Sequence, residues 1–255
     1  MWLAILPVYL LLTYIYNCDK YEKEPTDMLT KAFLWGFFGV SFLAIVGELS
    51  LSAIFNPVLG EEFTVIISTV ISAPLFEEGF KFMFLYLLIW NDKNFNEHFD
   101  GIVYAVYISM GFACLENILY VFAGGSLVGI IRAIYSVPSH FINATVMGYF
   151  FALARFNRDR EGEYLSYGLL GAMFTHALFN GTIVFSGFFG SSDEAHGLFG
   201  LAALTVLSII LWIFAVRNIR RLSELSKDDS PALEAEAKLR KNRRNNHDIN
   251  DDNAA

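Results

Sequence analysis

The chain has 255 residues, of which 55% are hydrophobic and 16% are aromatic. This composition excludes an ordinary soluble domain and is typical of a protein that crosses a lipid bilayer several times. The formal net charge of −8 selects no class of partner by itself. The chain has no glycine-rich phosphate loop and no nucleic-acid-binding signature, so we expect the lipid bilayer, and no nucleic acid, as a partner.

Seven apolar segments are predicted to be transmembrane helices, because most of them reach the roughly 20 residues that cross a bilayer. The first segment is the shortest. Because it lacks a basic n-region and a small-residue cleavage site, we interpret it as an anchor and not as a cleaved signal peptide. The predicted fold class is all-α and polytopic, with about seven spans: Trp2–Tyr16, Ala32–Phe55, Thr64–Trp90, Gly101–Phe122, Leu127–Phe151, Leu165–Phe189 and Gly197–Val216.

The basic residues predict the orientation of these spans. Of the 18 Lys and Arg, only Lys81 and Arg132 lie inside spans, and the other 16 (18 − 2) fall in alternate loops and in the tail. We expect the protein to lie in the plasma membrane. The positive-inside rule then places its N-terminus outside the cell and its C-terminus in the cytoplasm. We expect residues 1–221 to form a transmembrane domain and residues 222–255 a polar cytoplasmic tail, partly helical and then disordered.

Ionisable and amide side chains occur deep inside four of the predicted spans. A charged residue within a membrane helix is expensive and is a functional-site hypothesis by default. At a rise of about 1.5 Å per residue, the central members of the set lie about 16–22 Å along their spans, near the bilayer midplane. The set within residues 63–189 is Glu77, Glu78, Lys81, Glu116, Asn117, His140, Asn143, His176 and Asn180.

Two carboxylates with two imidazoles in a sealed cavity are suited to peptide hydrolysis. Glu77 or Glu78 can take a proton from water as the general base, and His140 can orient that water or protonate the leaving amine. His176 and Asn180, four residues apart on one helix face, can donate hydrogen bonds to the oxyanion. The sequence therefore predicts a buried catalytic cavity at the midplane.

Further charged and amide residues are expected to support this cavity. Lys81, three and four residues after the glutamates, can neutralise one carboxylate. Asn117 is expected to form interhelical hydrogen bonds. Glu48 and Arg132 lie nearer the outer face, and we favour a structural ion pair between them over a place for Arg132 beside the site.

These residues resemble the motif series of PrsW-type intramembrane proteases, which are similar to the CAAX-prenyl-protease and bacteriocin-processing superfamily. The superfamily series is EExxxR, FxxxH and HxxxN. The resemblance covers about half of the chain, in the same order. The matching residues are Glu77-Glu78-Gly79-Phe80-Lys81, Phe112-x-x-x-Glu116-Asn117, His140 and His176-x-x-x-Asn180.

The resemblance implies a metal-free, glutamate-based protease. It further implies that the enzyme makes the first cut in a membrane-anchored anti-sigma factor during envelope stress, so the expected partner is a single-span membrane protein. Glu77 and Glu78 match the catalytic pair, and His176 matches the essential histidine. Glu116 stands where the CAAX branch has a histidine, so we expect His140 to assist water activation. The spacing to Lys81 is one residue shorter than EExxxR, which leaves the choice of base between Glu77 and Glu78 open.

Two other functions compete with this interpretation. Two glutamates and two histidines are also potential zinc ligands, although no HExxH motif or cysteine ligand set is present. A zinc-dependent membrane protease, including CAAX-like processing, is therefore one alternative to the predicted absence of a cofactor. A proton-coupled transporter is the other, since midplane Glu and His residues also form proton relays. Inverted repeats or paired broken helices would favour the transporter, and the spans show neither.

Overall fold

A computed structural model describes residues 2–190 and 194–229, and in that part of the chain every regular element is a helix. The predicted all-α class is thereby confirmed. The expected tail lies outside the described residues from position 230 onward, whereas residues 222–229 continue the last helix. The elements are α1 (Trp2–Cys18), α2 (Thr26–Leu34), η1 (Trp35–Val40), α3 (Ser41–Leu59), α4 (Glu61–Ile67), η2 (Ser68–Ser72), α5 (Ala73–Ile89), α6 (Asp100–Ile134), α7 (Ser136–Phe156), η3 (Arg158–Arg160), α8 (Glu161–Gly190) and α9 (Glu194–Asp229).

Within the described residues, five helical stretches are long and apolar enough to cross a membrane. One of them joins α6 and α7, which pack against each other, and α1 is shorter, at 17 residues. The chain is therefore a multi-pass membrane protein, and the count of seven spans stays a prediction. The stretches are Thr26–Leu59, Glu61–Ile89, Asp100–Phe156, Arg158–Gly187 and Leu198–Asp229.

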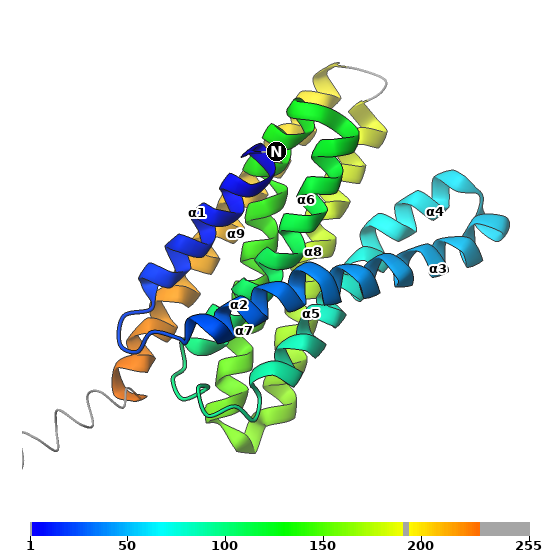
Figure 1. The fold of residues 1–255 in the computed structure, drawn as a ribbon. Helices are drawn as coiled ribbons and strands as arrows, with labels where there is room; N and C mark the ends of the chain where they lie inside the picture. Colours follow the sequence, from blue (N-terminus) through cyan, green and yellow to red (C-terminus); the bar gives the residue numbers. More distant parts are fainter. Residues whose placement is uncertain (1, 191–193, 230–255) are drawn as a thin grey trace, which may run out of the picture.

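The helix α6 forms the centre of the bundle, with α1, α7 and α2 packed against it (Figure 1). Every residue from Asp100 to Cys114 is buried except the half-buried Tyr107. Small residues in this stretch let the neighbouring helices approach closely: a Cβ on Gly101 would lie 2.7 Å from the backbone oxygen of Gly148 on α7. A Cβ on Gly111 would lie only 2.0 Å from the backbone oxygen of Phe33, so α6 and α2 touch backbone to backbone.

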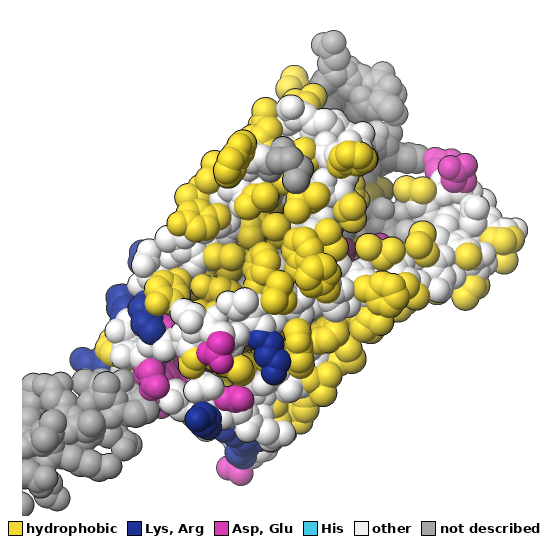
Figure 2. Space-filling view, viewed as in Figure 1, with side chains coloured by type: hydrophobic (Ala, Val, Ile, Leu, Met, Phe, Trp, Pro, Cys, Tyr) yellow, Lys and Arg dark blue, Asp and Glu magenta, His cyan; other side chains and the backbone are white. Residues whose placement is uncertain are grey.

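The hairpin of α3 and α4 projects away from the main bundle (Figure 1). Figure 2 shows hydrophobic side chains over most of the visible flank, and Lys, Arg, Asp and Glu gathered at the end of the bundle where α2 begins. This distribution is the one expected of a protein with a lipid-facing belt and one strongly charged end.

Two helical stretches contain a wider π-helical turn, η1 and η2. The second directly precedes Pro74 and the glutamate pair on α5. Such π turns are common at functional sites because they change the phase of the helix face that follows. The helix α6 is also broken, at Gly125, whose φ of 76° turns the last residues of α6 back along the helix.

Candidate functional site

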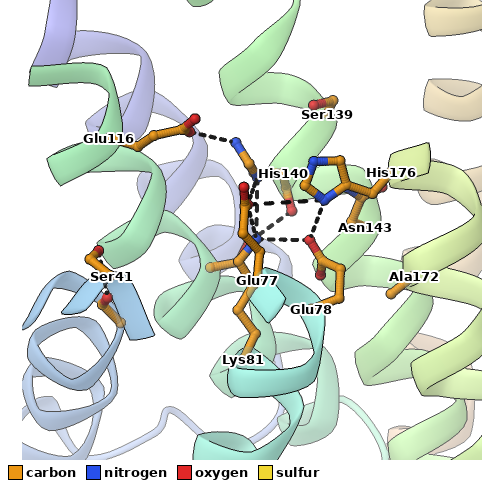
Figure 3. A network of polar contacts seen from close by, with 12 residues as sticks. Ser41, Glu77, Glu78, Lys81, Glu116, Ser139, His140, Asn143, Ala172 and His176 are labelled. Carbon is orange, nitrogen blue, oxygen red and sulfur yellow. Dashed lines mark hydrogen bonds and ion pairs between the residues drawn. The ribbon is translucent and has the colours of Figure 1, made fainter. Parts of the chain in front are cut away.

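The glutamate pair lies on α5 with its own counter-cation. Glu78 and Lys81 are almost fully buried, at 0% and 1% exposure. The Lys81 ammonium donates to Glu78 Oε1 (2.8 Å), to Glu77 Oε2 (3.3 Å) and to His140 Nδ1 (3.3 Å). An ammonium has three N–H donors, so these three acceptors use all of them. Lys81 therefore ties α5 to α7 and compensates the charge of the buried carboxylates (Figure 3).

His176 reaches the same pair from α8. Its Nδ1 donates to Glu78 Oε1 over 2.9 Å and lies 4.0 Å from Glu77 Oε2. Because Nδ1 faces a carboxylate, the hydrogen-bond network assigns the proton of the neutral ring to this nitrogen. The Nε2 atom forms no hydrogen bond with any described residue, and in Figure 3 it points away from the glutamates. His176 is thus held by Glu78 and keeps one basic nitrogen free.

His140 on α7 is held at both ring nitrogens. Its Nδ1 accepts from Lys81, and its Nε2 donates to Glu116 Oε2 over 2.9 Å. Glu116 in turn accepts from Arg132 Nη2 over 2.7 Å. Asn117 accepts from Arg132 Nε and donates to the backbone oxygen of α1 at position 4, as expected of an interhelical link. These contacts form a chain from α7 through α6 to α1.

The expected ion pair between Glu48 and Arg132 is wrong. Arg132 pairs with Glu116 because the break at Gly125 folds the end of α6 back beside the preceding turns. Glu48 lies on α3 and forms no hydrogen bond or ion pair with the described residues. The second possibility for Arg132, a place beside the site, matches the geometry.

A cavity of about 300 Å³ opens next to these side chains, and its lining includes Glu77 but not Glu78. A smaller one of about 190 Å³ lies between α3 and α6 and also reaches Glu77. Asn180 lines the larger cavity, and its Nδ2 donates to the backbone oxygen of Thr69 in η2 over 2.9 Å. One N–H of Asn180 is thus committed to the π turn, and the second is available.

Two aromatic residues complete the surroundings of the site. The ring of Phe112 lies 4.3 Å from the Lys81 ammonium and 5.5 Å from the His140 ring, so it forms the apolar floor of the ion cluster. Tyr120 lines both cavities. Sequence reasoning gave neither a role of its own. The i,i+4 spacing on either side of Glu116 is the signal that places all three on one face of α6.

Comparison with known proteins gives the family of the chain. The family model described as "PrsW family intramembrane metalloprotease" matches residues 24–215. The chain belongs to this family. It is 36% identical to Protease PrsW of Clostridioides difficile (strain 630) over 184 residues, 70% of this chain and 76% of the relative. The protein of Geobacillus kaustophilus (strain HTA426) is 34% identical over 180 residues, 69% and 76% of the two chains. That of Bacillus subtilis (strain 168) is 34% identical over 160 residues, 62% and 69%.

These matches confirm the resemblance to PrsW-type proteases and establish an intramembrane protease. No solved structure matches the chain. The transporter alternative has no counterpart among these relatives.

The family description includes a metal, and the donor atoms of the site fit one. Glu77, Glu78, His140 and His176 each offer one ligand atom, and these atoms all lie within 4.8 Å of one another. Imidazole nitrogens and carboxylate oxygens are ligands that zinc accepts. The Lys81 ammonium already contacts three of the four. A divalent cation held by all four would therefore compete with Lys81 for the same lone pairs.

Proposed function

We propose that this protease hydrolyses a peptide bond of a membrane-anchored, single-span protein with a water molecule activated by Glu77. The observation that carries the proposal is the difference between the two glutamates. Glu77 lines both cavities, whereas Glu78 is fully buried and committed to Lys81 and His176. A general base must reach the proton that it takes, and only Glu77 faces space that water and substrate can occupy.

Glu77 carries the one proton that is transferred in this reaction. Water donates one hydrogen bond to the free Nε2 of His176, and its oxygen attacks the scissile carbonyl carbon while Glu77 takes a proton. The tetrahedral oxyanion accepts a hydrogen bond from the second N–H of Asn180. The C–N bond then breaks, and protonated Glu77 returns the proton to the leaving amine. Glu78 does not contact the substrate; it positions His176 by accepting a hydrogen bond from its Nδ1–H.

A metal-dependent form of the same hydrolysis is the second candidate, favoured by the four clustered donor atoms and by the family description. Glu77, Glu78, His140 and His176 would hold the ion, which would supply Lewis-acid activation of water. Lys81 favours the metal-free form, because its ammonium already binds one oxygen of each carboxylate that the ion would need. The second oxygen of Glu78, Oε2, is buried and has no hydrogen-bond partner among the described residues, so it is the atom that a cation could still take.

The test compares purified variants on a labelled single-span substrate. Glu77→Gln should reduce cleavage to background. Glu78→Gln should leave a residual rate about 10²–10⁴-fold lower than the parent, as for loss of a group that orients a catalytic histidine. Glu62→Gln, the same substitution at an exposed position of α4, is the matched control. Equal and partial losses in both site variants would contradict the assignment of the base.

The requirement of the activity for a metal is tested on the same purified proteins. In the metal-free form, activity persists in EDTA and phenanthroline. Stoichiometric zinc, with activity lost on chelation and restored by metal, would establish the second candidate.

The natural substrate is proposed to be an anti-sigma factor whose cleavage begins a stress response, as the family resemblance implies. Membrane proteomes of parent and Glu77→Gln cells should then differ in one single-span protein that accumulates in the variant. Accumulation of only multi-span or soluble proteins would contradict this substrate class.

A further inference from the structure

Glu48 is a carboxylate at the junction of the two cavities. It lines the larger cavity together with Glu77 and His140, and the smaller one between α3 and α6 together with Phe112. Its neighbour Gly47 allows this position, because a Cβ at Gly47 would lie 2.7 Å from the Phe76 ring of α5. The close crossing of α3 and α5 therefore brings Glu48 to the rim of the catalytic cavity.

The cations of the site are already committed to other carboxylates. Arg132 is bound by Glu116 and Asn117, and all three donors of Lys81 are used. Glu48 is half-buried and has no ion-pair or hydrogen-bonding partner among residues 2–190 and 194–229. A carboxylate inside a membrane helix without a partner is costly, and such residues mark substrate or ion pathways.

The charge of the larger cavity is unbalanced in consequence. Its lining holds three carboxylates, those of Glu48, Glu77 and Glu116, and one guanidinium, that of Arg132. With ionised carboxylates and neutral histidines, the formal charge of the lining is −2 (1 − 3). Adding Glu78 and Lys81, which lie behind the lining, leaves this value unchanged. In a low-dielectric site such an excess is relieved by proton uptake or by a ligand that brings positive charge.

We propose that Glu48 determines substrate specificity by binding the ammonium or guanidinium of a Lys or Arg close to the scissile bond. This inference rests on the proposed function and adds a substrate class to it. A neutral peptide N–H would satisfy the lone pairs of Glu48 without offsetting its charge, whereas a basic side chain does both. The cavity between α3 and α6 leads from Glu48 to Glu77, so one segment can present a basic residue to the first while its backbone reaches the second.

The test uses a set of single-span substrate peptides. Each peptide carries one Lys, placed in turn at each of the four positions on either side of the cleaved bond. Met replaces Lys in the matched peptide, because it has a similar length and no charge. The parent protease should cleave the best Lys peptide about 10–100-fold more efficiently in kcat/KM than its Met counterpart, as expected for one desolvated charge pair. Glu48→Gln should bring the ratio near one, Glu48→Lys should prefer a Glu peptide, and Glu62→Gln should keep the parental ratio.

Binding on a Glu77→Gln background separates this inference from the proposed function. The affinity ratio of Lys and Met peptides for that protein reports on Glu48 whether or not the mechanism is right. The ratio should fall on adding Glu48→Gln. Equal affinities for the two peptides, or a ratio that survives Glu48→Gln, would overturn the role of Glu48. Residual cleavage by Glu77→Gln alone would instead overturn the assignment of the base.

Discussion

Replacing Lys81 with Met should destabilise the protein far more than the loss of one surface charge. The substitution keeps the length of the side chain but removes an ammonium that donates to Glu77, Glu78 and His140 at 3.3, 2.8 and 3.3 Å. Two buried carboxylates are left without a counter-cation, so the local charge of this ion cluster changes from −1 to −2. Breaking a buried ion pair by removing one partner costs about 3–5 kcal/mol.

The size of the effect can be read as a melting temperature in detergent. At about 2–4 °C per kcal/mol for a chain of this size, the midpoint for Lys81→Met should fall by about 6–20 °C. The double variant Lys81→Met/Glu78→Gln restores the cluster charge to −1. It should therefore recover about 1–3 kcal/mol relative to Lys81→Met alone, as expected for residues in direct contact. Stability is the readout, because it can be measured whether or not the variants retain turnover.

Glu77→Gln provides the internal comparison. Its bond to Lys81 is longer than that of Glu78, at 3.3 Å against 2.8 Å, so its coupling to Lys81→Met should be smaller. If Lys81→Met melts at the parental temperature, or if its effect and that of Glu78→Gln are additive, the ammonium does not compensate the pair and the reasoning fails.

Three further predictions concern other parts of the molecule. Burial raises the pKa of Asp19, outside the spans, to about 6, so the native state holds a proton there that the unfolded chain releases near pH 4. The stability that this proton contributes is lost as pH rises through 6, and Asp19→Asn should raise the melting temperature at pH 8 and not at pH 4; an equal gain at both values would refute this. Gly111→Ala should destabilise strongly, because its Cβ would lie 2.0 Å from a backbone oxygen of α2, and an unchanged midpoint would refute that packing. Reporter fusions after Arg160 and Arg221 should both read as cytoplasmic, and an external signal at either would refute the orientation.

The helical membrane fold and the membership of the site could be predicted from the sequence alone. Apolar runs of the length of a bilayer leave a helix as the only way to satisfy the backbone, so the all-α class needs no tertiary information. The cost of a charge in that environment marks Glu77, Glu78 and Lys81 on its own. Counting residues along each span was enough to place His140 and His176 at a similar depth, because the rise per residue is constant.

The direction of each side chain around its helix axis was decided only by the tertiary structure. Glu77 and Glu78 differ by one residue, about 100° of rotation, and a π turn such as η2 changes the phase of every residue that follows it. Sequence spacing therefore could not say which glutamate faces the cavity. Arg132 paired with Glu116 instead of Glu48 for a similar reason: the positive φ of Gly125 reverses the chain over a few residues. Depth in the membrane is a property of one helix, whereas facing depends on how several helices pack.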